Sequence, residues 1–286
     1  MTLHISRRAL RCAALAALLI LDGTAPHIVD PEIPGARDSI INLGEGLDEP
    51  AMRPRLPHIR ACMSDHAACS RRARACLAAA AALAQENAAM LQAAMDEERL
   101  FQMTRALIQA VLANDAPKTA APRVRPIITD AVTPKGKISL IAENAQPRVI
   151  RLLFHGGMDG TPVLRQVSAA ARAAGYSVEE HLCPTVPGRL LHVTIPALAT
   201  LVTTSEQLSA EQTFDFAACI PQGALLRHEC ALEQGRAGIQ LHLHRACAAL
   251  AQAKQLHDEL ESFYVPNMDF AKWQTMLDRT LESLKS

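Results

Sequence analysis

Apolar and polar residues recur with different periods along the chain, and these periods separate helical from strand-forming stretches. Residues 56–113 are rich in alanine and have helical spacing, which predicts two or three helices. Two further long helical patterns end the chain, at residues 225–262 and 268–285. Between these regions lie five short apolar runs that predict buried strands: RPIITDAVTP, VIRLLFHG, YSVEEHLC, LLHVTIP and ALATLVTT.

One amphipathic helix is expected between the second and third of these runs. It covers residues 162–174 and ends at Gly175, the residue type that most readily takes the left-handed conformation closing a helix. Its apolar stripe, which should face the core, consists of Val163, Leu164, Val167, Ala171 and Ala174. Strands that alternate with a helix indicate an α/β fold with a parallel sheet, to which the long helices are appended.

Two parts of the chain resemble each other and suggest a repeat. The letters RAC open an alanine-rich helix at Arg74–Cys76 and another at Arg245–Cys247. The apolar run LLILD, which ends at Asp22, matches ATLVT in hydrophobic profile. We therefore expect two related units, the first a mostly helical remnant without its front part. The expected divisions are residues 1–115 for this remnant, 116–123 for a linker, 124–224 for the second α/β unit and 225–286 for its helical segment.

The N-terminus admits a second interpretation. Arginines precede the apolar stretch Cys12–Leu21, as in a short signal peptide. That stretch is too short to cross a bilayer as a helix. The repeat favours a core strand at this place, and with it a retained N-terminus.

Charge and cysteine usage narrow the function classes. The chain has 29 basic and 29 acidic residues, which argues against a nucleic-acid tract and against a polybasic membrane patch. Its eight cysteines include no CxxC pair, a usage typical of reduced cytosolic thiols rather than of a disulfide framework. We therefore expect a cytoplasmic protein that binds neither nucleic acid nor membrane.

The segment FHGGMDGTPVL, residues 154–164, lies between a predicted strand and a predicted helix, which is the setting of a phosphate-binding P-loop. In the best register Gly157 is the first glycine of the motif, and Gly160 lies inside it. Pro162 then stands at the last glycine, Val163 at the lysine that reaches the phosphates, and Leu164 at the hydroxyl that binds Mg²⁺. The loop thus lacks the cation and the metal ligand that ATP hydrolysis requires.

Two interpretations of this loop remain. Gly156, Gly157 and Gly160 are left as a weak anion site near a helix N-terminus. Alternatively, Thr161 is simply a good N-cap and Pro162 a suitable first helical residue, so that the loop is an ordinary turn. If nucleotide does bind, Arg148, Arg151 or Arg165 is a candidate for the missing charge.

Other residues carry weaker signals. An apolar run that ends in Asp22 has the pattern of a Walker B strand, although an aspartate before Gly23 also suits a turn, and the second unit has Thr203 at the matching place. A metal site is conceivable where helical spacing brings together His58, Cys62, His66 and Cys69. We favour a packing seam there and expect no metal, because cysteine behaves as a small buried apolar residue in such helices. His181 and Cys183 end a strand, as either functional or packed residues, and His242 and His244 face different ways.

Several stretches resemble a bacterial family of tandem P-loop ATPases that are nucleotide-kinase-like. They are LILDGTAPHIVDPEIPGARDSIINLGEGLDE, ITDAVTPKG, GYSVEEHLCPTVPGRLLHVTIPAL and KQLHDELESFYVPNMDF. The resemblance implies a P-loop NTPase-like fold, ATP and Mg²⁺ as cofactors, and a site at Gly156, Gly157, Gly160, Thr161 and Asp22.

The expected function is that of a truncated ATP-binding member of this family, weak or inactive because the Walker A lysine and Ser/Thr are missing. The alternatives are a non-enzymatic interaction module, in which the helical segments bind a partner or self-associate, and a fragment without activity.

Overall fold

The computed structural model describes residues 2–6, 19–22, 30, 32–36, 38–144 and 146–285. The chain divides into two compact units, one made of Met1–Asp65 with Gln255–Ser286 and the other of His66–Lys254. Two long helices, α2 (Leu56–Gln92) and α5 (Gln222–Tyr264), each contribute residues to both units.

The second unit is built on a six-stranded sheet with the order β11-β7-β10-β9-β8-β4. The strands are β4 (Val124–Ile127), β7 (Arg148–Leu153), β8 (Val178–Leu182), β9 (Leu190–Ile195), β10 (Thr200–Thr203) and β11 (Gln212–Asp215). Three pairings are parallel, namely β4 with β8, β10 with β7 and β11 with β7. The α/β class is therefore confirmed, with a mostly parallel sheet.

One strand departs from the expected parallel arrangement of the sheet. β9 runs antiparallel to both of its neighbours, β8 and β10. The connection from β8 to β9 spans only residues 183–189, which is too short for the crossover that a parallel pair needs. A hairpin is the only way to pair these two strands.

A second, smaller sheet comes from the first apolar run. RPIITDAVTP supplies both β4 and β5 (Asp130–Thr133), and β5 forms an antiparallel hairpin with β6 (Gly136–Ser139). Gly136 has a φ of 110°, a conformation that favours glycine and lets the hairpin turn tightly. Short 3-10 helices at Ile141–Asn144 and Pro196–Leu198 connect strands of this unit, and a third at Phe216–Cys219 lies between β11 and α5.

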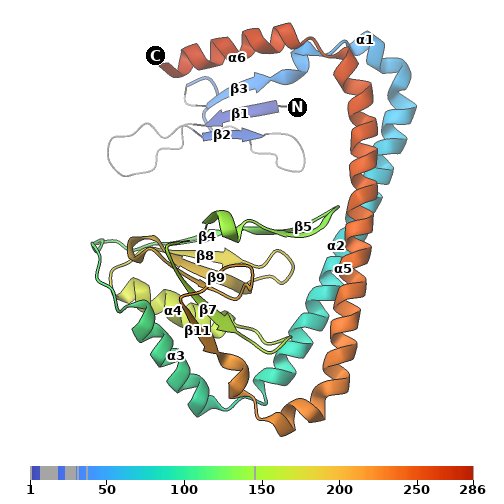
Figure 1. Ribbon diagram of the computed structural model, residues 1–286. Helices are drawn as coiled ribbons and strands as arrows, with labels where there is room; N and C mark the ends of the chain where they lie inside the picture. Colours follow the sequence, from blue (N-terminus) through green and yellow to red (C-terminus); the bar gives the residue numbers. More distant parts are fainter. Residues whose placement is uncertain are drawn as a thin grey trace. The chain divides into compact units, whose positions relative to one another are not determined.

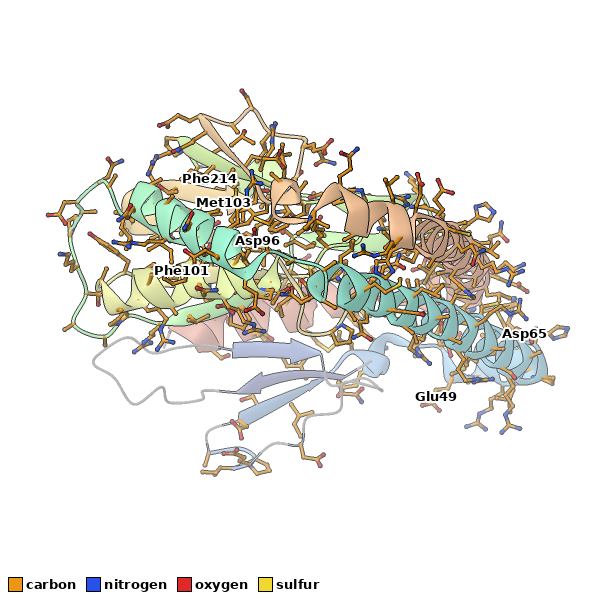
Figure 2. All side chains as sticks on the ribbon, turned by 90° about the horizontal axis from the view of Figure 1, so that it is seen from below. Glu49, Asp65, Asp96, Phe101, Met103 and Phe214 are labelled. Atoms are coloured by element: carbon orange, nitrogen blue, oxygen red, sulfur yellow. The ribbon has the colours of Figure 1, made fainter. Side chains whose placement is uncertain are left out.

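Two helices complete the core of the second unit, α3 (Glu97–Val111) and α4 (Thr161–Ala173). α4 packs on β8 and β9, and α3 packs on α4 (Figure 1). The predicted stripe of α4 faces the core, with its members buried except the half-buried Ala174. Figure 2 shows Asp96, whose carboxylate caps α3, and the core-packing side chains Met103 and Phe214.

The parts of α2 and α5 within the second unit lie side by side (Figure 1). Gly235 of α5 leaves room for the side chain of Asn87, and Gly238 leaves room for Leu83. The Cys69 thiol of α2 lies 3.8 Å from the Gln252 side-chain oxygen of α5. Small residues therefore allow the two backbones to approach closely.

The first unit has its own antiparallel sheet, in the order β2-β1-β3. Its strands are β1 (Thr2–Ser6), β2 (Leu19–Asp22) and β3 (Asp38–Asn42). The predicted strand ending at Asp22 is thus present, but it pairs antiparallel with β1. Residues 7–18 and 23–29, which include most of the expected signal-like stretch, lie outside the described residues.

The end of the chain packs on the segment after β3. α1 (Glu49–Met52) and the 3-10 helices Leu43–Gly46, Arg53–Arg55 and Val265–Asn267 precede α6 (Phe270–Lys285) in this unit. The Trp273 indole N–H donates to the Leu43 carbonyl at 2.9 Å, and its ring fills the space beside Gly46. The Asp269 N–H also donates to the Gly46 carbonyl at 2.8 Å, so two stretches that carry the family resemblance, NLGEGLDE and VPNMDF, contact each other directly.

No helix among the described residues combines the length and apolar character that a membrane crossing requires.

Candidate ligand-binding cavity

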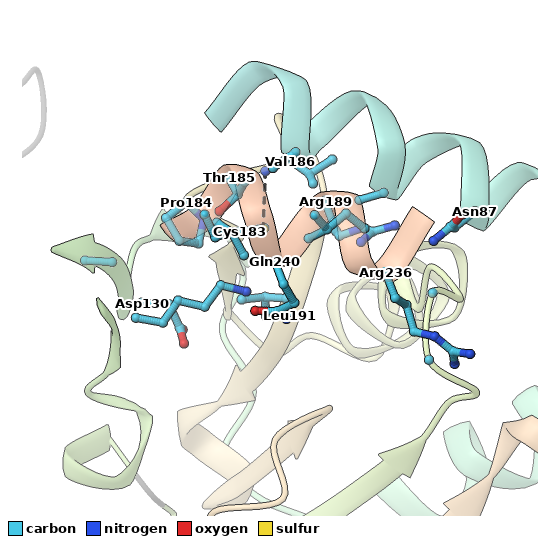
Figure 3. A pocket seen from close by; sticks show the side chains of 18 of the residues that line it. Asn87, Asp130, Cys183, Pro184, Thr185, Val186, Arg189, Leu191, Arg236 and Gln240 are labelled. Carbon is cyan, nitrogen blue, oxygen red and sulfur yellow. Dashed lines mark hydrogen bonds between the residues drawn. The ribbon is translucent and has the colours of Figure 1, made fainter. Parts of the chain in front are cut away.

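A cavity of about 610 Å³ lies within the second unit (Figure 3). Its walls come from α2, the β5–β6 hairpin, the loop after β7, the β8–β9 connection with the start of β9, and α5. The polar side chains on its walls are Asn87, Asp130, Lys137, Thr185, Arg189, Arg236 and Gln240. A volume of this size suits a small organic ligand.

The glycine-rich loop contributes two residues to this cavity, Gly156 and Gly157. Gly157 has a φ of 112°, which an L side chain rarely adopts, and a Cβ there would lie 3.3 Å from Asn87. A Cβ on Gly156 would lie 3.5 Å from an Arg236 guanidinium nitrogen. Neither glycine N–H donates a hydrogen bond within the described residues.

The other two predicted loop residues face elsewhere. The Phe154 ring occupies the space beside Gly160, where a Cβ would lie only 2.6 Å from it. The Thr161 hydroxyl donates to Asp159 at 2.6 Å and accepts from the Leu190 backbone N–H at 2.9 Å. Gly160, rather than Thr161, is the N-cap of α4. Gly160 and Thr161 therefore do not line the cavity.

Burial explains why the remaining P-loop chemistry is absent. Val163 is 2% exposed and Leu164 is 0% exposed, and both belong to the main apolar core. These positions face the sheet, so a lysine or serine there would be buried away from the cavity. The structure offers no protein oxygen at Leu164 for Mg²⁺, so the expected metal does not fit this loop.

The positive charge of the cavity comes from residues that the sequence did not single out. Lys137, Arg189 and Arg236 line it. Arg189 Nε lies 3.4 Å from the Asp159 carboxylate, while its buried Nη2 has no hydrogen-bond partner among the described residues.

The three arginines considered from the sequence are engaged elsewhere. Arg148 donates to the Ala110 carbonyl at 2.8 Å. Arg151 donates to the Leu208 carbonyl, and Arg165 to the Gly188 carbonyl at 3.0 Å. None of the three lines the cavity.

Asn87 is the clearest sign that the cavity is adapted to a ligand. It is 2% exposed, and its amide nitrogen has no partner among the described residues. Figure 3 shows its side chain near that of Arg236, at the same end of the cavity. A buried amide that donates to nothing costs about 1–3 kcal/mol, and a turn of the Asn87 side chain toward a polar occupant of the cavity would relieve this cost.

The opposite end of the cavity carries one carboxylate, that of Asp130 (Figure 3). Its Oδ2 accepts from the Thr129 hydroxyl at 3.0 Å and lies 3.4 Å from His192 Nε2. Partial burial opposes ionisation, but the contacts with His192 and with Ser139 outweigh it and lower the pKa of Asp130. The cavity thus presents a fixed negative charge.

A network of buried side chains lies behind Asp130. His181 Nδ1 lies 3.1 Å from the Thr129 hydroxyl, and its Nε2 lies 2.9 Å from the Thr194 hydroxyl. His192 Nδ1 lies 2.7 Å from the Thr203 hydroxyl. Burial, assisted by the neighbouring His192, lowers the pKa of His181 to about 4, so the ring is neutral at pH 7. His181 is therefore a packed strand residue rather than an exposed functional one.

Of the residues considered as metal ligands, Cys62 is buried, His66 and Cys69 are half-buried and His58 is exposed. The buried Cys62 thiol donates to the Leu256 carbonyl at 3.1 Å, and burial raises the pKa of this thiol. It is therefore held in the protonated form, which binds metals poorly. In the described ranges, three side chains come close enough to share a metal ion, the exposed His257, Asp258 and Glu261. Asp22 belongs to the first unit, whereas every residue of the cavity belongs to the second.

Comparison with known proteins leaves the chain without an assigned family, because no family model, no curated protein and no solved structure matches it. The resemblance to tandem P-loop ATPases therefore stays a prediction. Sequence reasoning found Gly156 and Gly157 but missed Asn87, Asp130 and Arg236. These come from three separate elements. Asp130 lies in the stretch ITDAVTPKG, which carries the family resemblance, but no local pattern identifies any of the three as a ligand-binding residue.

Proposed function

We propose that the second unit binds a small phosphate-bearing ligand of the nucleotide class in this cavity and does not hydrolyse it. The observation that carries the proposal is the convergence of donors at one end of the cavity. Two glycine N–H groups, the Arg236 guanidinium and the unpartnered Asn87 amide gather there. Backbone N–H groups and arginine are the donors that phosphate oxygens accept most readily.

Charge supports an anionic ligand. Three cationic side chains and one carboxylate line the cavity, which gives its walls a net positive charge. Apolar side chains of α2 and α5, including Ala80, Ala84 and Leu243, supply a surface on which a base can pack.

The absence of hydrolysis follows from the loop. Leu164 is buried where an ATPase has its metal-binding hydroxyl, and the Thr161 hydroxyl is bonded to Asp159. Without a lysine at Val163, no side chain of the loop stabilises charge on a departing phosphate. We expect binding in the high micromolar range, with little effect of Mg²⁺.

Calorimetric titration of the full chain with pyrophosphate, AMP and ATP tests the proposal. We expect Arg236→Ala to weaken binding about tenfold or more, since it removes one charge-assisted contact. Arg227→Ala is a matched control, because Arg227 is an exposed arginine of the same helix that does not line the cavity. Equal affinity in all three proteins, or no binding of any of the three ligands, would reject the proposal. Release of phosphate from ATP at an enzymatic rate would reject the absence of hydrolysis.

A further inference from the structure

Asp130 stands at the cavity wall in front of two chains of hydrogen-bonding side chains. A carboxylate only accepts, so the Thr129 hydroxyl donates to it and must receive its own hydrogen bond from His181 Nδ1–H. His181 Nε2 is then an acceptor for the Thr194 hydroxyl. Every donor along this chain points toward Asp130.

The second chain converges on the same oxygen. His192 Nε2 lies 3.4 Å from Asp130 Oδ2 and has no hydrogen-bond partner among the described residues, and His192 Nδ1 lies 2.7 Å from the Thr203 hydroxyl. His192 and Thr203 are buried in the sheet. The Thr129 hydroxyl therefore anchors Oδ2, the His192 ring lies beside it, and Ser139 also contacts the carboxylate.

The stability of the core does not require such a network of buried polar side chains. Buried polar groups stabilise a fold no better than well-packed apolar ones of the same shape. Here they hold one carboxylate in a fixed position at the wall of a cavity, as the supporting residues of a binding site do. Asp130 is thus placed to recognise a ligand rather than to stabilise the core.

We propose that Asp130 accepts hydrogen bonds from the two ribose hydroxyls of a nucleotide whose phosphate lies at Gly156, Gly157 and Arg236. This inference rests on the proposed function, and it adds that the ligand carries a free ribose diol. Figure 3 shows Asp130 and Arg236 at opposite ends of the cavity, and the ligand that we propose contacts both.

Two other partners for Asp130 are disfavoured by its surroundings. An ammonium group on the ligand would meet Lys137, which lines the cavity from the same hairpin. A divalent cation would find a single carboxylate, one oxygen of which already accepts a hydrogen bond from the Thr129 hydroxyl. Hydroxyl groups bring no charge and donate directly to a carboxylate.

The test compares AMP with 2′,3′-dideoxy-AMP, which lacks both ribose hydroxyls, by calorimetry on the full chain. We expect AMP to bind about tenfold or more tightly, the effect of losing hydrogen bonds to a charged group. In Asp130→Asn this advantage should shrink to less than about threefold, while the dideoxy nucleotide binds as before. Asp65→Asn, at an exposed aspartate outside the cavity, should keep the full advantage.

The ligand comparison needs no substitution, so it remains decisive even if Asp130→Asn does not fold. Equal binding of the two nucleotides by the unmodified chain overturns the inference, and so does an AMP advantage that appears only with Mg²⁺. If both nucleotides bind equally and Arg236→Ala weakens the binding of both, the result supports the proposed function and rejects the role of Asp130. If AMP, the dideoxy nucleotide and pyrophosphate all fail to bind, the result rejects both proposals.

Discussion

Individual residues decide whether the glycine-rich loop acts as a P-loop. Val163 and Leu164 occupy the lysine and hydroxyl positions of the motif, and both are buried in the core behind the loop. The Phe154 ring packs against Gly160, and the Thr161 hydroxyl donates to the Asp159 carboxylate. The two glycines that precede them, Gly156 and Gly157, face the cavity. The two glycines therefore remain at the cavity wall, whereas the positions that would carry the catalytic residues of a P-loop are packed in the core.

Restoring the motif should unfold the protein before it restores catalysis. Val163→Lys places an unpaired ammonium in the core, which should lower the free energy of unfolding by about 3 kcal/mol or more. Gln166→Lys, at an exposed position of the same helix, should change it by less than about 0.5 kcal/mol. Urea denaturation measures both. A stable Val163→Lys variant that binds ATP tightly with Mg²⁺ would show that this position does reach the ligand.

The buried His181 should make stability depend on pH. Its pKa is about 4 in the folded chain, below the ordinary value of 6.5, so the unfolded chain binds a proton more readily. The contribution of His181 to the free energy of unfolding is complete above pH 6.5 and is lost as the pH falls from 6.5 to 4. That loss amounts to about 3 kcal/mol. The lowered pKa of Asp130 adds a loss of the same sign at low pH.

Denaturation at a series of pH values measures this dependence. His181→Gln, which does not titrate, should flatten the slope between pH 6.5 and 4. An unchanged slope in this variant would mean that His181 is not the group responsible.

At the scale of elements, the approach of α2 and α5 shapes one side of the cavity. A methyl group on Gly235 would lie 2.2 Å from the Asn87 side-chain oxygen. Gly235→Ala should therefore destabilise the chain by about 1–3 kcal/mol, through overpacking, and should also displace Asn87 and weaken ligand binding.

Gly223→Ala is the matched control on the same helix. A Cβ at Gly223 meets nothing within 4 Å, so alanine there should leave stability unchanged or raise it by up to about 1 kcal/mol. Thermal melting and nucleotide titration of the two variants measure the contrast. Equal stability of the two would contradict the close helix contact.

Most elements could be predicted from the sequence, because their periodicity is strong. The long helices, α4 and the strands β7, β8, β9 and β10 all lie close to their predicted bounds. β6 and β11 were missed because their segments, GKIS and QTFD, are short and lack an apolar pattern. The direction of β9 was open to prediction, since a connection of residues 183–189 permits only a hairpin.

At the scale of the molecule, the cavity depends on segments that are far apart in the chain. Asn87, Asp130 and Arg236 meet only because the fold of the second unit brings their elements together. A local sequence pattern cannot predict that these three residues line the same cavity. Gly156 and Gly157 could be predicted because they belong to one short motif. The expected self-association through the helical segments and the cytoplasmic location stay predictions.

Ligand binding should stabilise the second unit. A nucleotide at ten times its dissociation constant should raise the free energy of unfolding by about 1.4 kcal/mol. Hydrogen exchange should slow in the segments that line the cavity, including the β5–β6 hairpin and residues 183–191. Arg236→Ala should reduce this protection at the same nucleotide concentration. Protection confined to the first unit would place the ligand elsewhere.

The most direct test of the central claim is a crystal structure of the chain with bound AMP. We expect the phosphate to lie within hydrogen-bonding distance of the Gly156 and Gly157 N–H groups and of the Arg236 guanidinium. We expect the loop at Gly160 and Thr161 to remain packed on Phe154 and Asp159. A phosphate cradled at residues 160–164, or bound outside the cavity, would contradict the claim.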